Sequence, residues 1–287
     1  MFGTLAALAS SAVAFEQAGM LERQNLTGNW NGIRPVLSAH GFEPYLTYTG
    51  LTWSNLAGGV DTSTVFDGFL NFGADADLGK AGAWNGLGFH ADFHWWHGRL
   101  PTQVLIGGTP ALALSGWEAS HTLRVYNLYL RQSFGEDRWV IKVGQIAADT
   151  DFMVSRYGGI FLNGAFGDLP SQNLNIAAPV YPLAAPGFIA LVEPLARLTG
   201  RFGAYTGDPG EDETSNHGFD WKLGNNAGYT FFSELATTAA VASRPGTYTL
   251  GGIYETGGVD QFGTATALRA PLRALVDARN LPAPVEK

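Results

Sequence analysis

Three histidines within eight residues are the side chains of this chain that could most readily share a metal ion. His90, His94 and His97 lie in the string HADFHWWH. On a helix, His90 and His94 would project from one face and could coordinate the same ion. On a strand they also share a face, but they lie about 13 Å apart at roughly 3.3 Å per residue. Apolar and polar residues alternate through this string, which indicates a strand, so we predict no metal site.

Two aspartates are the other candidates for chemistry. Asp149 and Asp151 could suggest the paired carboxylates of a glycosidase, but nothing in the sequence supplies the separation that this reaction requires. The chain has no Cys, which excludes disulfides, iron–sulfur clusters and a thiol nucleophile. It also lacks the G-x-S-x-G, phosphate-loop and H-E-x-x-H motifs, which carry common catalytic and nucleotide-binding sites. We predict that the chain is not an enzyme and binds no cofactor.

The composition points to a β protein. The 287 residues include 17 Lys or Arg and 25 Asp or Glu, which gives a formal net charge of −8. Because nucleic acids are bound by clustered cations, this balance argues against nucleic acid as a partner. Charged residues make up 15% of the chain and aromatic residues 13%, and there are 38 glycines. Low charge with many glycines and aromatics favours a turn-rich sheet over a helical fold.

The N-terminal residues predict export and one short helix. Residues 1–14 form a short apolar run that ends in A-x-A, as signal peptides do before their cleavage site. We therefore expect a signal peptide over residues 1–14 and export through a bacterial inner membrane. In the following segment, residues 15–43, apolar residues recur at helical spacing between Trp30 and Leu37. This spacing predicts a short helix that ends by Gly41.

No later segment has the pattern of a membrane-spanning helix. The longest uncharged stretch, Leu169–Val192, contains four prolines. Because proline removes helix donors and breaks helices, we expect this stretch to be mostly loop. A membrane role would then require a closed β-barrel, the other structure that satisfies every backbone group in lipid.

Period-2 alternation dominates from residue 44 onward. In Val65–Leu78 the even positions are apolar or small, whereas most odd positions are acidic or polar. This pattern predicts a strand with one apolar face and one polar face. Strands are also predicted at Phe89–His97, Arg138–Gly144 and Leu198–Thr206, and with less regular alternation at Thr47–Trp53, Thr122–Phe134, Phe219–Leu235 and Tyr248–Glu255. Breaks rich in Gly, Asn, Asp and Pro separate these segments and indicate turns.

The aromatic residues favour a transmembrane barrel over a soluble sandwich. Trp and Tyr lie near the ends of many predicted strands, as Trp53, Trp139 and Tyr254 do. Such residues prefer membrane–water interfaces, where the apolar ring and its polar atom are both satisfied. A β-sandwich with aromatic core residues remains the alternative at this point.

Several strings in collinear order resemble the carbohydrate-selective outer-membrane porin family (OprB type). Leu26–Arg34 looks like the family's L-x-G-D-W-G-G-x-R string, with Asn29 and Asn31 in place of Asp and Gly. Residues 143–155 are similar to its G-Q-x-x-x-D-x-x-F-x-x-S stretch. The other matching strings lie within residues 48–59, 161–167, 178–187, 207–209 and 246–254. Together they extend the resemblance over about residues 25–262.

The resemblance implies an all-β fold, an antiparallel transmembrane β-barrel of sixteen strands in the bacterial outer membrane. It also implies passive diffusion of monosaccharides such as glucose, often through a homotrimer. Carbohydrate solutes, outer-membrane lipid and the barrel-assembly machinery would be the partners, and no cofactor is implied. About ten strands fit before residue 262, so the barrel region, residues 44–262, is expected to be incomplete.

The end of the sequence departs from the family pattern. Residues 264–287 contain no Gly and no aromatic residue, whereas members of the family usually end in a strand with a terminal aromatic. We interpret residues 263–287 as an atypical tail, such as a frameshift or an early stop produces. An open barrel leaves two unpaired edges. Two alternatives therefore stay open: a porin fragment without function, and an exported soluble β-sandwich that binds sugars.

The polar faces of the predicted strands supply the candidates for lining a pore. They are Asp67, Asp75, His90, Asp92, His94, Trp96, Lys142 and Arg201. Because sugars are neutral, the polar groups would act by hydrogen bonding to hydroxyls, and the Trp96 ring could stack on a sugar. A structural salt bridge or a solvated loop position is the competing explanation for any one of them.

Overall fold

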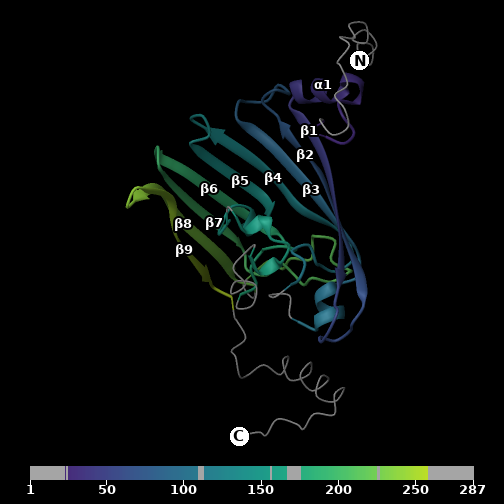
Figure 1. Cartoon of the computed structure of the whole chain (residues 1–287). Helices are drawn as coiled ribbons and strands as arrows, with labels where there is room; N and C mark the ends of the chain where they lie inside the picture. The colour runs from purple at the N-terminus through teal and green to yellow at the C-terminus, as the bar shows by residue number, and fades with distance from the viewer. Residues whose placement is uncertain are drawn as a thin grey trace.

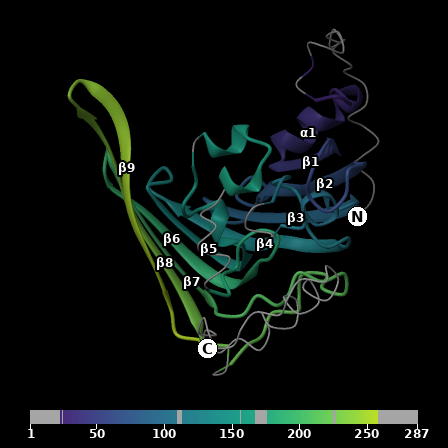
Figure 2. The same cartoon turned by 60° about the horizontal axis from the view of Figure 1, so that its bottom comes forward.

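The computed structural model describes residue 23 and residues 25–108, 113–155, 157–166, 176–224 and 227–257. These residues form one nine-stranded sheet in which each strand pairs with the next along the chain. All eight pairs are antiparallel. The strands are β1 Phe42–Ser54, β2 Thr64–Asp77, β3 Leu87–Gly98, β4 Leu123–Phe134, β5 Trp139–Ile146, β6 Ala185–Leu195, β7 Leu198–Thr206, β8 Tyr229–Val241 and β9 Arg244–Glu255. The sheet curves into an open trough (Figures 1 and 2).

The helical elements are few and short. A 3-10 turn, η1 Trp30–Gly32, leads into α1 Ile33–Ala39, which ends just before β1. The remaining ones are η2 Thr102–Ile106, η4 Ala148–Thr150, η5 Gly158–Ile160 and η6 Gly164–Phe166. Among the described residues, no helix has the length and apolar character needed to cross a membrane.

The predicted fold class is confirmed, because the chain is an antiparallel sheet preceded by one short helix. The described residues hold nine strands, close to the ten expected for residues 44–262. They form a single sheet instead of the two packed sheets of a sandwich. The predicted signal peptide, residues 1–14, and the tail, residues 263–287, lie outside the described residues.

Two sequence predictions are corrected. Leu169–Val192 was expected to be mostly loop, and residues 176–184 are loop, but no strand was predicted where β6 begins at Ala185. The prolines do not prevent this strand, because Pro186 is its second residue and a proline-free run follows, and proline is tolerated where a strand begins. The strand expected at Phe219–Leu235 begins ten residues later, at Tyr229. Its first part instead belongs to the connection that follows β7.

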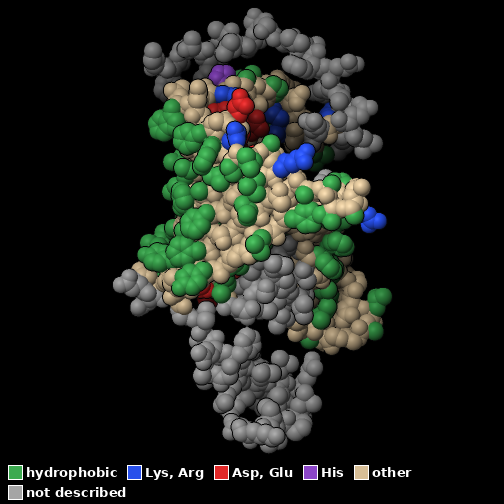
Figure 3. All heavy atoms as spheres, turned by 90° about the vertical axis from the view of Figure 1, so that its left-hand side faces the viewer, with side chains coloured by type: hydrophobic (Ala, Val, Ile, Leu, Met, Phe, Trp, Pro, Cys, Tyr) green, Lys and Arg blue, Asp and Glu red, His purple; other side chains and the backbone are tan. Residues whose placement is uncertain are grey.

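Alternation separates an apolar outer face from a polar inner face. On the outer face, large side chains such as Leu46, Leu130, Val143 and Leu250 are exposed. Figure 3 shows one side of the molecule, where hydrophobic side chains spread over the surface and most of the visible charged side chains gather near one end. Exposed apolar surface of this extent marks a contact with something other than water.

The two ends of the sheet differ in their connections. At the end where α1 lies, the strands are joined by residues 78–86, 135–138, 196–197 and 242–243. At the other end, residues 55–63 form one short connection, whereas the connections 99–122, 147–184 and 207–228 are much longer. The described parts of these long connections fold onto the concave side of the sheet (Figure 2). Buried clusters join them to the wall, for example Phe152 with Ile189, Tyr205 and Phe232.

Candidate functional site

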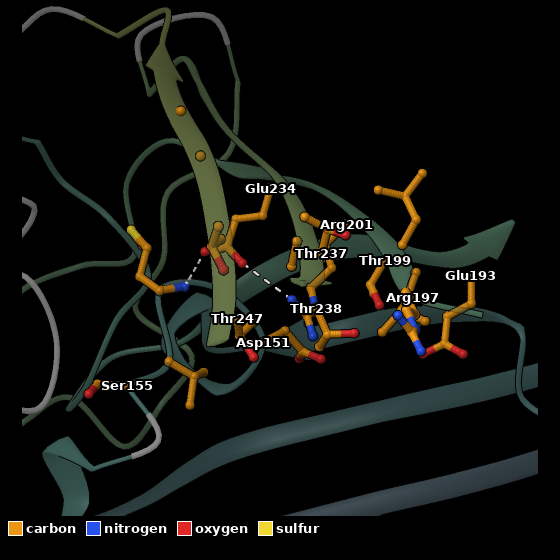
Figure 4. Close-up of a pocket in the computed structure, with 18 of the residues that line it drawn as sticks. Asp151, Ser155, Glu193, Arg197, Thr199, Arg201, Glu234, Thr237, Thr238 and Thr247 are labelled. Atoms are coloured by element: carbon orange, nitrogen blue, oxygen red, sulfur yellow. Dashed lines mark hydrogen bonds and ion pairs between the residues drawn. The ribbon is translucent and has the colours of Figure 1, made fainter. Parts of the chain in front are cut away.

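The concave wall contains a depression of about 1160 Å³ between β6–β9 and residues 150–155. Figure 4 shows the side chains that line it. Its volume exceeds the roughly 300–1,000 Å³ of ordinary small-molecule pockets. The depression therefore resembles a wide passage more than a site shaped around one ligand.

Seven of the residues that line this depression carry a hydroxyl group. The Thr and Ser residues are Thr150, Ser155, Thr199, Thr237, Thr238, Thr247 and Thr249. Charged side chains are interspersed among them: Asp151, Glu193, Arg197, Arg201 and Glu234. A hydroxyl both donates and accepts hydrogen bonds, so this surface can exchange hydrogen bonds with a polar solute in many orientations.

One ion pair and one hydrogen bond hold the segment after β5 against the wall. Lys142 Nζ on β5 lies 2.8 Å from each carboxylate oxygen of Asp151. On the opposite side, the backbone amide of Met153 donates to Glu234 Oε1 on β8. Arg201 on β7 lies 3.4 Å from the other oxygen of Glu234. The segment is thus fixed to the wall at Asp151 and Met153, and it narrows the space inside the sheet.

A line of rings crosses the inner wall on β1, β3 and β4. The rings of His90 and Tyr129 stack with centroids 4.9 Å apart, and Tyr45 stacks on the other side of His90 at 6.4 Å. His90 Nδ1 lies 2.7 Å from Asp75 Oδ1, and Lys142 Nζ lies 5.2 Å from the centre of the Tyr129 ring. Because the faces of these rings are covered by one another, the groups left to face the interior of the sheet are ring edges, hydroxyls and charged groups.

Deeper on β2–β4, the wall is covered by the long connections. Trp96 Nε1 donates to the Tyr181 hydroxyl at 2.6 Å, and that hydroxyl donates to the Trp117 carbonyl. The Arg124 guanidinium, which is fully buried, donates to the carbonyls of Pro182 and Asn216. These contacts tie all three long connections to the sheet.

Glu118 holds the first of these connections together. It accepts hydrogen bonds from the Thr102 hydroxyl and from the amides of Thr102 and Ser115. Burial raises the pKa of the Glu118 carboxyl above its ordinary value, although these hydrogen bonds oppose the shift.

The eight predicted lining residues fall into two groups. Asp75, His90, Lys142 and Arg201 keep part of their side chains accessible from the interior. Asp67, Asp92, His94 and Trp96 are buried under the long connections. All eight project from the inner face, but contact of any of them with a solute stays a prediction.

Asp92 lies between two histidines of β3, His90 and His94. Its Oδ2 atom is 3.7 Å from His90 Nε2 and 3.7 Å from His94 Nε2. His97 belongs to the outer face, where Tyr48 hydrogen bonds to it at 3.2 Å. No group of three His, Asp or Glu side chains within the described part of the chain is arranged to hold a metal ion.

Sequence reasoning missed most residues of the depression. Glu234 was inside a predicted strand, but its partner Arg201 is identified only by the register between β7 and β8. Thr237 and Thr238 lie beyond the predicted end of that strand, and Thr247 lies just before the next predicted one. The alternation through Leu198–Thr206 did place Thr199 and Arg201 on the same face of a strand. It was the one pattern in the sequence that could have identified a residue of the depression.

The comparison with known proteins extends over most of the chain. Residues 66–281 match the family described as "Carbohydrate-selective porin, OprB family". Similar proteins are "Porin B" of Pseudomonas aeruginosa, 28% identical over 247 residues, and "Putative porin QuiX" of Acinetobacter baylyi, 24% identical over 264 residues. They align with 82% and 85% of this chain but with 53% and 58% of their own lengths. The chain thus spans little more than half of these relatives.

A solved structure supports the fold. The high-pH structure of OprB from Pseudomonas putida has a TM-score of 0.71 and 24% identity, and the match covers 82% of this chain and 57% of that one. The low-pH structure of the same protein gives a TM-score of 0.52. The relatives are named as porins, which agrees with the prediction that the chain is not an enzyme. The family match covers three quarters of the sequence, and the chain belongs to the carbohydrate-selective porin family, OprB.

Proposed function

We propose that this chain forms part of the wall of an outer-membrane pore through which neutral sugars diffuse passively. The observation that carries the proposal is the depression with seven hydroxyl-bearing and five charged residues on the inner face of a sheet whose outer face is apolar. The family's description names carbohydrates, and we expect monosaccharides such as glucose as the solutes. The same proposal includes insertion by the barrel-assembly machinery and a homotrimer as the assembled form.

The outer face suits lipid. Transmembrane barrels carry an outward apolar band and keep polar groups inside, and the exposed Leu46, Leu130 and Val143 side chains fit such a band. Outer-membrane barrels have short periplasmic turns and longer extracellular loops. We therefore assign the end with α1 to the periplasm and the end with residues 99–122, 147–184 and 207–228 to the cell exterior.

The charges of the inner wall favour neutral solutes over anions. Both permanent cations among the candidates face a carboxylate: Lys142 faces Asp151, and Arg201 faces Glu234. His90, which is a cation only when it is protonated, faces Asp75. Because these charges are matched locally, little net field attracts an anion, and hydrogen bonding to hydroxyls becomes the main interaction.

We assign two roles to the predicted lining residues. Asp75, His90, Lys142 and Arg201 contact the passing solute or its water. Asp67, Asp92, His94 and Trp96, which lie beneath the long connections, position those connections within the lumen.

Liposome swelling tests the proposal. Protein assembled in the outer membrane of a Gram-negative host is purified without denaturation and reconstituted, and swelling is followed in isosmotic glucose and in glucuronate. We expect faster swelling in glucose than in glucuronate. Swelling at the rate of protein-free liposomes, by protein whose resistance to cold SDS shows a closed barrel, contradicts the transport function.

A matched pair of variants shows whether glucose passes along the inner face of the sheet. Replacing Thr199 and Thr249 by Val removes two hydroxyls from the depression, and Thr52→Val removes one from the outer face. Only the first change should alter glucose swelling. An exported soluble sugar-binding protein, the alternative left by the sequence, would instead be released by osmotic shock and would not be recovered from the membrane fraction.

A further inference from the structure

A glycine on β7 leaves a notch in the inner wall. Gly203 pairs with Ile189 of β6 on one side and with Phe232 of β8 on the other. Ile189 and Phe232 are both 1% exposed and belong to one buried cluster on the concave side. Gly203 is not in the left-handed conformation, so any L-residue could adopt its backbone angles. Because glycine has no side chain, the row formed by these three residues is lowest in its middle.

The ring of Phe152 fills this notch. Phe152 follows β5, is 1% exposed, and has its ring centroid 5.4 Å from that of Phe232. A Cβ atom added to Gly203 would lie 2.8 Å and 2.9 Å from two atoms of the Phe152 ring. Carbon atoms in favourable contact are about 3.5–4.0 Å apart. The ring therefore rests directly on the backbone of β7, with no room for a side chain between them.

The chain turns sharply after Phe152. Met153 has a φ of +58°, a left-handed conformation that residues other than glycine rarely adopt. Its backbone amide donates to Glu234 (Figure 4). The next residue, Val154, is 64% exposed and lines the depression. One residue thus separates the buried ring from the lumen, so the depth of the ring in its notch sets how far residues 153–155 protrude.

We infer that Gly203 determines the size of the sugar that can pass the depression, because its missing side chain sets the distance between residues 153–155 and the wall. The inference rests on the proposed pore and adds a size limit to it. A side chain at position 203 cannot push the wall back, since β7 is paired with β6 and β8 on both sides. The opposite side is open, because it faces the depression of about 1160 Å³. A displaced ring therefore moves residues 153–155 into the lumen.

Gly203→Ala tests the size limit. The added methyl group should displace the Phe152 ring toward the lumen by roughly 1 Å. Swelling is measured in xylose, glucose and maltose with the protein prepared as for the glucose experiment. Because a narrower passage impedes larger solutes more, the rates in glucose and maltose, each divided by the rate in xylose, should fall at least about twofold. Phe152→Ala, which removes the ring from the notch, should raise both ratios.

Two variants distinguish the size limit from a general loss of structure. Gly200→Ala adds the same methyl group to β7, but there it meets only the end of the Val192 side chain, at 3.2 Å, and both ratios should stay unchanged. Combining Gly203→Ala with Phe152→Leu puts a smaller side chain over the filled notch, so this double variant should return both ratios to the wild-type values. The urea midpoint should follow the same order, lowered by Gly203→Ala and raised again in the double variant.

The outcomes separate the inference from the proposed function. Swelling in all three sugars with wild-type ratios in Gly203→Ala overturns the size limit, as does a double variant that leaves the ratios low. If Gly203→Ala does not assemble, Phe152→Ala decides, and unchanged ratios in that variant overturn the inference. Closed barrels of the wild type that swell in none of the sugars contradict the transport function itself, and the size limit with it.

Discussion

Lys142 Nζ lies 2.8 Å from both carboxylate oxygens of Asp151, which joins the middle of β5 to the segment that narrows the lumen. The two side chains are 17% and 12% exposed, so water screens the pair weakly. Lys142→Met should therefore lower the free energy of unfolding by about 2 kcal/mol, because a mostly buried carboxylate loses its charged partner. The measurement is the urea midpoint of the assembled protein in detergent micelles.

Two further variants show whether loss of the Lys142–Asp151 ion pair causes the drop in stability. Adding Asp151→Asn to Lys142→Met should restore part of the loss, since no isolated charge then remains. Arg131→Gln breaks an ion pair with Asp137 that lies in an exposed turn, and it should cost less than about 1 kcal/mol. Equal losses for Lys142→Met and Arg131→Gln would contradict the special role of the buried pair.

Arg201 is predicted to set the charge preference of the lumen. It is 28% exposed, and it pairs with Glu234, which is 6% exposed. Arg201→Gln removes the accessible cation and leaves the carboxylate of Glu234. The pore should then pass dissolved cations more readily than anions. One charge at about 6 Å in water corresponds to about 0.7 kcal/mol, or roughly a threefold change in the cation-to-anion permeability ratio. Reversal potentials in a salt gradient measure it, with Lys222→Gln, whose side chain is 65% exposed, as the control that should leave the ratio unchanged.

Leu130 tests whether the outer face meets lipid. It lies on the outer face of β4, about 13 Å along the strand from Phe134, which ends it. Leu130→Arg should destabilise the protein in lipid vesicles by about 2–4 kcal/mol, whereas Phe134→Arg, near the interface, should cost at most about 1 kcal/mol. A soluble sandwich would tolerate both changes equally, so equal small losses would speak against membrane insertion.

Glu118 should make stability depend on pH in a defined direction. Burial raises the pKa of its carboxyl above the ordinary 4.5, so the folded protein binds this proton more tightly than the unfolded chain. Its contribution to stability is therefore greatest at low pH and declines as pH rises from about 4.5 through the raised pKa. Over that interval, the urea midpoint of the wild type should fall relative to the urea midpoint of Glu118→Gln. A difference that does not change with pH would contradict this assignment.

How much the sequence predicts depends on the range of the interactions involved. Alternation along Val65–Leu78 is a local property, and it correctly separated the outer Phe66 from the inner Asp67. Whether an inner position faces open space depends on distant contacts instead. Trp96 is covered because Tyr181, 85 residues away, donates and accepts hydrogen bonds above it, and a pattern of period 2 contains no information about such a contact.

The same limit explains the missed site residues and the missed strand. Glu234 meets Arg201 because β7 and β8 pair in one register, which a single-strand pattern does not define. β6 was overlooked because the prolines of the preceding connection dominated its composition, although its own run from Gly187 to Val192 is free of proline. Tertiary pairing with β5 and β7 on both sides is what makes that run a strand.

Arg124 is the residue on which the arrangement of the long connections should depend most. Its guanidinium is fully buried and donates to the carbonyls of Pro182, Asn216 and Glu213. It also lies 3.1 Å from a carboxylate oxygen of Asp212. Five donors in a planar fork can satisfy such a set at once, whereas a lysine has three donors on a point charge. Arg124→Met should cost about 3–5 kcal/mol, and Arg124→Lys should recover only part of it.

Arg138 provides the matched control for that prediction. Its guanidinium also donates to backbone carbonyls, those of Glu193 and Pro194, but in an exposed position. Because water can replace these hydrogen bonds, Arg138→Met should cost less than about 1 kcal/mol. Limited proteolysis adds a local readout, since loss of the Arg124 contacts should expose the connection 207–228 to cleavage while the strands remain protected. If Arg124→Met and Arg138→Met are cleaved and unfolded alike, the long connections are held by apolar packing, and the buried guanidinium is not what fixes them in the lumen.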